Sequence, residues 1–430
     1  MQLFGTSGIR RPVDSELVRI AFQVGFSVGA VYHNVVIGRD TRTSGDVLRH
    51  AVVAGILASG AGCFDAGIVP TPTLAFATQK FAAGIMITAS HNPPQYNGLK
   101  LFNPDGSAFA DAQQKEIETL TGQAITSVAR WDKMMSGVSL DNAVELHTDR
   151  VMQDFSAGLR LRVVVDAGCG AAYFITPSLL TRLGCEVIPL NCHPNGVFPR
   201  DAEPTEASLG ELSCAVKESG AAVGIAHDGD ADRAMAVDER GRFISGDRLL
   251  CILAQAYGAR EIVTTIDASM CLEEMGSKVR RTKVGDPYVA EELKKGGEFG
   301  GEPSGAWIFP KVSLCPDGVY AAAMIATLAS REKLSDLADS IPSYPVIRGN
   351  IAAPATAMPE IKQRLVAELK PAVVDTIDGV KLYFEDGWLL VRSSGTEPKV
   401  RISAEGKNET TARRLFDSGT RIVRSVLGSS

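Results

Sequence analysis

The chain has 430 residues, of which 45% are hydrophobic and 22% charged, and its formal net charge is −6. This length predicts about two to four domains, and the composition is ordinary for a globular protein. The sequence has no basic cluster or Lys/Arg-rich tail, so a nucleic-acid partner is not expected.

The N-terminal segment lacks a charged stretch followed by an apolar one, so we expect no secretory signal peptide. No apolar run approaches the roughly 18 residues that a membrane span needs. The eight cysteines are scattered without a CxxC pair, which is typical of reduced thiols. We therefore expect a cytoplasmic protein with no membrane partner.

Short β-branched runs alternate with helical patterns along most of the chain, which favours βαβ units and mostly parallel sheets. Three stretches share one plan, because each begins with an apolar strand that ends in a polar turn. These strands are Val35–Asp40, Val163–Asp166 and Ile262–Asp267. The shared order of elements indicates a triplicated α/β unit.

A second strand in each of these stretches runs into an unusual loop. The three loops are Thr88–Pro93, His227–Arg233 and Gly301–Gly305. Ligands of parallel α/β sheets bind beyond the carboxyl ends of the strands. Three repeats would therefore present three chemically distinct loops toward one cleft.

The C-terminal part has a different pattern. Residues 379–392 form two alternating strands around the hairpin-type turn Glu385-Asp386-Gly387, and residues 411–427 have helical spacing. The predicted fold class is α/β: three related α/β domains with mixed, mostly parallel sheets, and a C-terminal α+β domain. The expected domains are residues 1–147, 148–245, 246–343 and 344–430.

The second loop carries carboxylates at alternate positions, Asp228, Asp230 and Asp232, directly after a buried strand. Their mutual repulsion is relieved if a divalent cation binds them, and an all-oxygen set in a compact loop suits Mg²⁺. The alternative interpretation is a solvated acidic turn.

Ser90 lies at a strand-to-turn corner, before His91-Asn92-Pro93-Pro94, which cannot continue a helix. Such a corner holds a nucleophile out of the sheet, although an ordinary turn serine fits the local pattern too. A Ser-His-Asp hydrolase is disfavoured, because the Gly-x-Ser-x-Gly elbow is absent and His91 is adjacent in sequence. A serine near a Mg²⁺ loop fits phosphoryl transfer better.

Two further loops are rich in groups that bind phosphate or sugar. The segment Arg392–Pro398, with Arg401 on the next strand, offers many N–H and O–H donors for a phosphate dianion. Glu302 and Ser304 in the third loop can bind two sugar hydroxyls. The alternatives are a hydroxyl-rich connection and a plain turn.

Two further segments of the sequence supply cations that could bind near the serine. Arg10 ends the Gly5–Arg10 segment and Lys100 follows the loop closely, so either could hold a phosphoserine, although each alone is more often a surface charge. His227 beside the acidic loop is expected to be a structural histidine.

These segments together, in this order and over the whole chain, resemble the α-D-phosphohexomutase superfamily. The resemblance implies four domains around a central cleft. Within the superfamily, Gly301–Trp307 looks like the archaeal-type phosphoglucosamine mutases. Many phosphomannomutase/phosphoglucomutase members carry His in place of Ala306, and several carry His in place of Asp286. Both departures favour a glucosamine phosphate and leave Asp286 or Lys100 as the acid/base group.

The resemblance implies a role for each matching residue. Ser90 would carry the phosphoryl group and, with Asp228, Asp230 and Asp232, hold one Mg²⁺ per chain. Arg10, Lys100 and Arg233 would surround the transferring phosphate. Glu302 and Ser304 would bind sugar hydroxyls. The residues implied to grip the substrate's other phosphate are Arg392, Ser394, Gly395, Thr396 and Arg401.

The function expected from this resemblance is interconversion of glucosamine 6-phosphate and glucosamine 1-phosphate through a phosphoserine and a bisphosphorylated sugar. A hexose 1,6-bisphosphate would be the activator, and small-molecule hexose phosphates would be the partners. A homodimer is one possible assembly, because the sequence does not fix the oligomeric state. The alternatives are a phosphomannomutase/phosphoglucomutase and a non-catalytic sugar-phosphate binder. Intact Ser90 and the three aspartates disfavour the binder.

Overall fold

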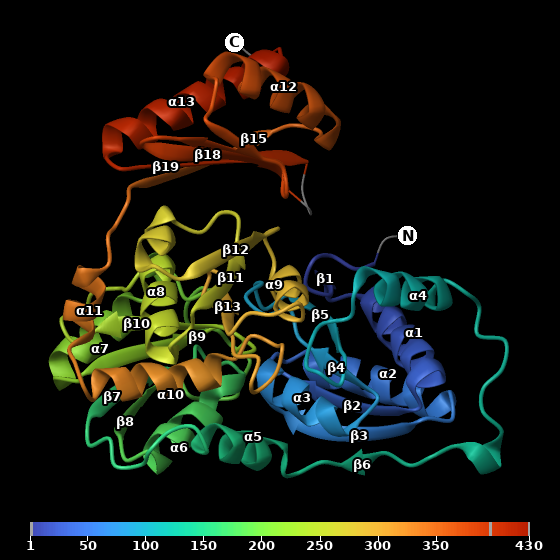
Figure 1. The fold of residues 1–430 in the computed structure, drawn as a ribbon. Helices are drawn as coiled ribbons and strands as arrows, with labels where there is room; N and C mark the ends of the chain where they lie inside the picture. Colours follow the sequence, from blue (N-terminus) through green and yellow to red (C-terminus); the bar gives the residue numbers. More distant parts are fainter. Residues whose placement is uncertain (1–2, 395–397, 429–430) are drawn as a thin grey trace.

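The computed structural model describes residues 3–394 and 398–428, which form four units along the chain, each built on its own sheet (Figure 1). The first unit has a six-stranded sheet in the order β1-β5-β4-β2-β3-β6. Its elements are β1 (Ile9–Pro12), α1 (Ser15–Tyr32), β2 (Asn34–Arg39), α2 (Gly45–Ala58), β3 (Gly62–Ile68), α3 (Thr71–Ala77), β4 (Ala83–Ile87), β5 (Tyr96–Phe102), α4 (Asp111–Thr121) and β6 (Val138–Ser139).

The second and third units repeat the plan with four strands each, in the orders β10-β9-β7-β8 and β12-β11-β13-β14. The second unit comprises α5 (Ala143–Met152), β7 (Arg162–Asp166), α6 (Ile175–Arg182), β8 (Glu186–Leu190), α7 (Gly210–Ser219), β9 (Val223–His227) and β10 (Ala234–Asp238). The third comprises α8 (Gly246–Tyr257), β11 (Glu261–Thr265), the 3₁₀ helix η5 (Met270–Met275), β12 (Lys278–Thr282), α9 (Asp286–Leu293), β13 (Phe299–Gly301), β14 (Trp307–Ile308), α10 (Gly318–Ala329) and α11 (Leu334–Ser340).

The three sheets are mixed and mostly parallel, as the sequence predicts. In each of them most strands pair in parallel, and the antiparallel pairs lie at one end of the sheet: β1–β5 and β5–β4 in the first, β10–β9 in the second and β13–β14 in the third. The central strands, such as Val163–Val165, are completely buried, because helices cover both faces of a parallel sheet. The predicted division between residues 147 and 148 lies within α5 and stays a prediction.

The fourth unit is an antiparallel sheet in the order β15-β19-β18-β17-β16, covered by two helices. Its elements are β15 (Val346–Ala352), α12 (Met358–Leu369), β16 (Val373–Asp375), β17 (Val380–Phe384), β18 (Gly387–Ser393), β19 (Lys399–Gly406) and α13 (Glu409–Val426). The predicted hairpin between β17 and β18 and the predicted C-terminal helix are both present.

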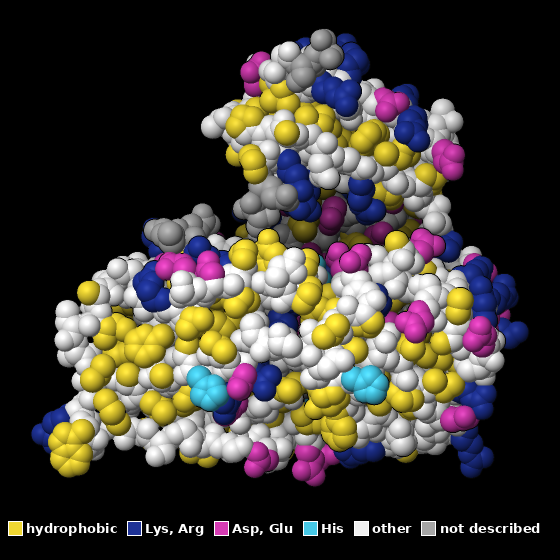
Figure 2. Space-filling view, turned by 180° about the vertical axis from the view of Figure 1, so that it is seen from behind, with side chains coloured by type: hydrophobic (Ala, Val, Ile, Leu, Met, Phe, Trp, Pro, Cys, Tyr) yellow, Lys and Arg dark blue, Asp and Glu magenta, His cyan; other side chains and the backbone are white. Residues whose placement is uncertain are grey.

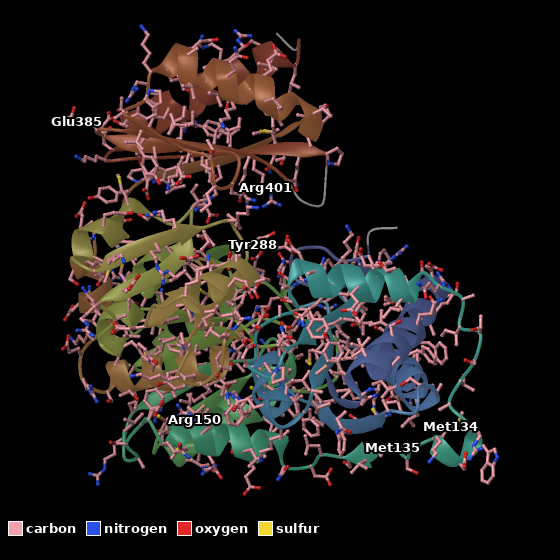
Figure 3. All side chains as sticks on the ribbon, turned by 45° about the vertical axis from the view of Figure 1, so that its right-hand side comes forward. Met134, Met135, Arg150, Tyr288, Glu385 and Arg401 are labelled. Atoms are coloured by element: carbon pink, nitrogen blue, oxygen red, sulfur yellow. The ribbon has the colours of Figure 1, made fainter. Side chains whose placement is uncertain are left out.

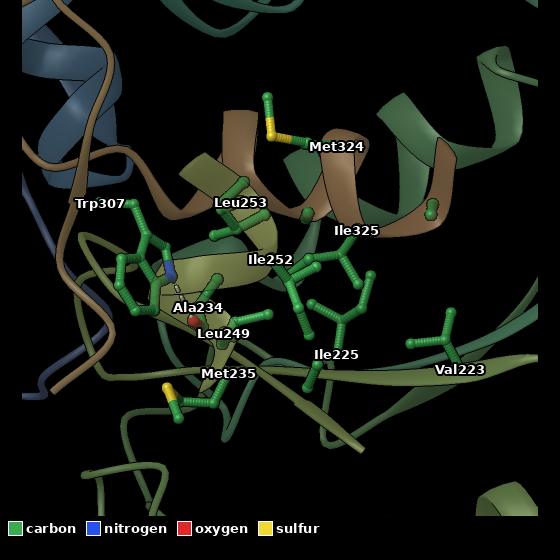
Figure 4. Packing of buried hydrophobic residues seen from close by; sticks show 14 of the residues in the cluster. Val223, Ile225, Ala234, Met235, Leu249, Ile252, Leu253, Trp307, Met324 and Ile325 are labelled. Atoms are coloured by element: carbon green, nitrogen blue, oxygen red, sulfur yellow. Dashed lines mark hydrogen bonds between the residues drawn. The ribbon is translucent and has the colours of Figure 1, made fainter. Parts of the chain in front are cut away.

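The second and third units share one hydrophobic core rather than packing as separate bodies. It joins Val163 and Ile225 of the second unit to Ile262 and Phe299 of the third. At the junction the Trp307 indole N–H donates to the backbone oxygen of Ala234 at 2.7 Å (Figure 4). This shared core fixes the loops after β9 and β13 relative to one another.

The fourth unit lies above the third and meets it through a buried joint (Figure 1). Trp388 and Leu390 of β18 pack on Ile266, which follows β11. The buried Glu405 accepts hydrogen bonds from the Trp388 indole at 2.6 Å and from the backbone N–H of Met270 at 2.9 Å. Beyond the joint, Lys/Arg side chains of the fourth unit face Asp/Glu side chains of the body across a notch (Figure 2).

Within residues 3–394 and 398–428, we find no helix with the length and hydropathy to cross a membrane.

Candidate active site

Ser90 lies in the loop after β4, and the backbone holds it in an uncommon conformation. Its φ is +49°, in the left-handed region, and only 1% of the residue is exposed. The Ser90 N–H donates to Thr88 Oγ1 at 2.9 Å, and the Thr88 hydroxyl donates to Asp40 Oδ2 at 2.6 Å. Non-glycine residues held in this region are typical of functional sites.

The serine hydroxyl points at the acidic loop of the second unit, donating to Asp228 Oδ2 at 2.7 Å. Asp228, Asp230 and Asp232 each place a carboxylate oxygen within 4.8 Å of the others, and all three residues are buried. The loop sits close because Gly229 has no side chain; an added Cβ would lie 2.6 Å from Ser90 O. The sequence-predicted serine and aspartates therefore come together.

The acidic loop is built for a cation. Asp230 Oδ1 and Asp232 Oδ1 are buried, and no hydrogen-bond donor within the described ranges reaches either atom. Orphaned buried carboxylate oxygens are rare unless a ligand completes them. The donor set contains only oxygen, as Mg²⁺ prefers. The residues present therefore fit a magnesium ion.

The positively charged ammonium group of Lys100, on β5, lies among the carboxylates of the acidic loop. Its Nζ lies 2.7 Å from Asp230 Oδ2 and 2.5 Å from Asp232 Oδ2. Burial lowers the pKa of Lys100, but the two carboxylates outweigh burial and raise it. Burial, with Asp232 and Asp230 adding to it, raises the pKa of Asp228 well above its usual range. Lys100 thus stays protonated and offsets part of the loop's negative charge.

The Gly301–Gly305 loop after β13, expected to bind sugar, is attached directly to the acidic loop of the second unit, expected to bind metal. Arg233 and Ala306 form a β-bridge, and the Ala234 N–H donates to Gly305 O at 3.0 Å. Glu302 Oε1 accepts from the Gly285 N–H at 2.9 Å. Ser304 Oγ is buried, and none of the residues described in the structure hydrogen-bonds to it. An unpartnered hydroxyl beside a carboxylate is suited to bind sugar hydroxyls.

A cleft of about 710 Å³ joins these loops to the fourth unit. The sequence-predicted residues that line it are Arg10, Ser90, Asp232, Arg233, Asp286, Glu302, Ser304, Arg392, Ser394 and Arg401. Arg401 lies at the edge of the fourth unit that faces the body (Figure 3). Lys100, Asp228 and Asp230 are not part of the lining. The predicted phosphate ligands Gly395 and Thr396 fall outside the described residues.

The family assignment follows from sequence comparison. The chain matches four consecutive models of phosphoglucomutase/phosphomannomutase: alpha/beta/alpha domain I over residues 1–126, domain II over 143–241, domain III over 245–344, and the C-terminal domain over 353–424. The chain belongs to the phosphoglucomutase/phosphomannomutase family. It is therefore a phosphosugar mutase, an intramolecular phosphotransferase.

Three similar proteins cover almost the whole chain. A probable phosphoglucosamine mutase of Methanococcoides burtonii is 44% identical over 99% of this chain and 100% of its own length. A phosphoglucosamine mutase of Methanococcus maripaludis is 41% identical over 99% of both. The crystal structure of a phosphoglucomutase/phosphomannomutase family protein from Burkholderia thailandensis superposes with a TM-score of 0.87 at 27% identity, covering 100% of this chain and 98% of that one.

In this phosphoglucomutase/phosphomannomutase chain, residues that the sequence analysis did not predict also line the cleft. They are His91, Glu203, Thr205, Asp267 and Arg348 among others. Glu203 accepts from Arg233 Nη1 at 2.6 Å, a contact made by a distant loop. Asp267 could have been predicted, because it ends the strand that opens the third repeat.

The surroundings of His91 and Asp286 shift the pKa values of these two residues in opposite directions. Burial, followed by the charges of Arg233 and Arg10, lowers the pKa of His91 to about 2, so this imidazole is neutral. Burial and the neighbouring Asp232 raise the pKa of Asp286. Because a base works best with a pKa near the working pH, Asp286 is better suited than the protonated Lys100 to accept a proton.

His227 has a structural part in this phosphoglucomutase/phosphomannomutase fold. It is fully buried, and its ring nitrogens lie 3.1 Å from Thr176 Oγ1 and 2.9 Å from Arg233 O. Burial lowers the pKa of His227 to about 4, which keeps the ring neutral between two fixed partners.

Proposed function

We propose that this chain interconverts glucosamine 6-phosphate and glucosamine 1-phosphate through phosphorylated Ser90 and a bisphosphorylated sugar. The observation that carries the proposal is the Ser90 hydroxyl, which is directed at the buried Asp228. Ser90 lines a cleft that also contains Glu302, Ser304 and several arginines. The substrate is supported by the relatives at 41% and 44% identity. It is further supported by Ala306 and Asp286, which stand where many or several phosphomannomutase/phosphoglucomutase members carry His.

The first transfer moves the phosphoryl group from phospho-Ser90 to the free hydroxyl of the bound hexose monophosphate. The bond between Ser90 Oγ and phosphorus breaks, and a bond from the sugar oxygen to phosphorus forms. Asp286 accepts the hydroxyl proton, and the departing Ser90 Oγ takes up a proton that restores the serine hydroxyl. Arg10 and Arg233 balance negative charge on the transferring group. The bisphosphate then turns over in the cleft and returns its other phosphoryl group to Ser90.

We assign the metal site to Asp228, Asp230 and Asp232, joined by an oxygen of phosphorylated Ser90. Bound there, Mg²⁺ supplies positive charge that stabilises the phosphoryl group in its transition state. Lys100 contacts and orients Asp230 and Asp232, and its charge lowers the pKa of Asp230 against the effect of burial.

Substrate binding is assigned to the third and fourth units. Glu302 and Ser304 bind sugar hydroxyls. Arg392, Ser394 and Arg401, with Gly395 and Thr396, hold the phosphate that is not being transferred. The phosphate site must accept the phosphate at either end of the sugar, so it recognises the phosphate dianion rather than the identity of the sugar. A hexose 1,6-bisphosphate can therefore bind and phosphorylate Ser90.

The test is turnover by purified protein with Mg²⁺ and a trace of glucose 1,6-bisphosphate. We expect the highest kcat/KM for glucosamine phosphate in a panel that includes mannose and glucose phosphates. The Ser90 peptide should gain the mass of one phosphate, and Ser90→Ala should lose both this mass and turnover. Absence of turnover with every hexose phosphate would sink the proposal.

A phosphomannomutase/phosphoglucomutase is the second candidate. It is supported by the structural match at 27% identity and by a phosphate site that recognises the charge of the phosphate rather than the identity of the sugar. A higher kcat/KM for mannose or glucose phosphate than for glucosamine phosphate would select it.

A further inference from the structure

Arg42, in the loop between β2 and α2, is a buried cation that contacts the serine loop without entering the cleft. Its side chain is fully buried, as is that of its ion-pair partner Asp40 at 3.0 Å. Neither residue is among the groups that line the cleft. Burying a guanidinium is unfavourable unless its charge and donors are satisfied.

All five N–H donors of this guanidinium are engaged. Nε donates to Asp40 Oδ2 at 3.0 Å. Nη1 and Nη2 donate to four backbone oxygens at 2.6–2.9 Å, three in the serine loop and one at the start of β5. These acceptors are Ser90 O, Asn92 O, Pro93 O and Tyr96 O. The loop therefore curls around one planar cation.

The same pair acts on Ser90 from its other side. Asp40 Oδ2 accepts from the Thr88 hydroxyl, whose oxygen in turn accepts the Ser90 N–H. Ser90 is therefore held at its N–H through Asp40 and at its carbonyl by Arg42. These two attachments account for the left-handed φ of +49° at Ser90, which an isolated loop would leave.

The second unit closes over this arrangement. The Phe198 ring lies 4.9 Å from the Arg42 guanidinium carbon, and the neighbouring Thr41 hydroxyl donates to Cys169 O at 2.7 Å. The serine loop is thereby held against the unit that carries the metal loop.

We propose that Arg42, with Asp40 as its counter-ion, is the positioning residue that aims Ser90 Oγ at the metal loop for phosphoryl transfer. The proposal rests on the proposed function, because it concerns the phosphorylated serine. Lysine cannot replace Arg42: an ammonium has three donors on one atom, whereas the four carbonyls and the carboxylate need a planar fork.

The test is a single-turnover measurement of Ser90 loading from glucose 1,6-bisphosphate with Mg²⁺, followed by quench and mass spectrometry. In this step a sugar oxygen–phosphorus bond breaks, the Ser90 Oγ–phosphorus bond forms, and the serine proton passes to the departing sugar oxygen. A loss of folded protein lowers the amplitude alone, whereas a misplaced nucleophile lowers the rate constant.

We expect Arg42→Lys to lower the rate constant about 100-fold, the effect of misplacing a nucleophile by about 1 Å. The steady-state KM should stay within about threefold, because the sugar and phosphate ligands are unchanged. Asp40→Asn retains the shape of the pair and should lower the rate constant about tenfold, which provides a second test if Arg42→Lys does not fold.

Val28→Ala is the stability control, because Val28 is fully buried in α1, away from the loop. It should lower thermal stability with an unchanged rate constant. Folded Arg42→Lys and Asp40→Asn proteins with wild-type rate constants, or with losses in amplitude alone, would overturn the inference. If wild-type protein is never phosphorylated on Ser90, the proposed function itself fails instead.

Discussion

At the scale of single residues, Lys100 offsets the negative charge of the acidic loop. It contacts Asp230 and Asp232, and the third aspartate of the loop lies within 4.8 Å of both. Without Lys100, the three buried carboxylates would lie close to one another with no ammonium group between them. Removing one partner of a buried ion pair is strongly destabilising, because it leaves a buried charge without compensation.

Lys100→Met should therefore lower the free energy of unfolding by about 3–5 kcal/mol in a chelator. Millimolar Mg²⁺ should recover much of this loss, since the metal supplies the missing charge and binds only the folded loop. Urea unfolding with EDTA and with Mg²⁺ measures both values. Lys115→Met, at an exposed position on α4, should change stability by less than about 0.5 kcal/mol. Equal losses in both buffers would contradict the metal assignment.

Among the elements, β17 places an amine in the apolar joint between the third and fourth units. Lys381 is completely buried, its Nζ lies 4.0 Å from the Trp388 ring centroid, and it donates to Ile266 O at 2.5 Å. Burial, followed by the charge of Arg281, lowers the pKa of Lys381 to about 7. β17 and β18 attach to the body through this buried joint. The charge state of Lys381 therefore affects how stably the fourth unit is held on the body.

This buried amine predicts a pH-dependent stability. In the unfolded chain the pKa of lysine is about 10.4, so between pH 7 and pH 10 the unfolded state binds more protons and stability rises with pH. The difference in unfolding free energy between wild type and Lys381→Met should shift in favour of wild type by about 2 kcal/mol from pH 7 to pH 9. Urea unfolding at pH 7, 8 and 9 measures it.

Lys362→Met is the matched control, because Lys362 lies exposed on α12 of the same unit. Its difference from wild type should stay flat over this range. A flat difference for Lys381→Met as well would show that the buried amine keeps its proton throughout, held by Trp388 and Ile266 O.

At the scale of the whole molecule, the proposed roles place the phosphoryl transfer and the binding of the second phosphate on different units. The first two units bring the serine and metal loops together, whereas the fourth contributes Arg348, Arg392 and Arg401 to the far side of the cleft. The fourth unit meets the body at the joint, and its arginines lie across the cleft from Ser90. Changes in the fourth unit should therefore act on substrate affinity more than on the transfer step.

Arg401→Met should raise KM about 10- to 100-fold, the effect of losing a charged hydrogen bond worth about 1.5–3 kcal/mol. We expect kcat to stay within about threefold, because the interaction is made in the ground state and the transition state alike. Arg421→Met, exposed on α13, should leave both constants unchanged. A large loss in kcat with unchanged KM for Arg401→Met would contradict this division.

The sequence was informative where chemistry is local. The alternating aspartates at 228–232 and the serine corner at 90 are short motifs, and strand and helix periodicity gave the repeated units and the fourth domain. Contacts between distant segments were less accessible. Arg42 acts on a loop about fifty residues later, and Glu203 reaches Arg233 from another loop, so neither carries a short-range pattern. No Gly or Pro marks the start of α5, so the sequence has no local signal for a domain boundary there.

Gly229 lies between two of the aspartates, and its backbone passes against the carbonyl of Ser90. The residue has no functional group, yet any side chain there would separate the serine from the acidic loop. Position 229 is therefore chemically silent but closed to substitution. When this chain diverges or is randomised in a library, we expect selection for activity to remove substitutions at position 229 as it removes substitutions of Ser90.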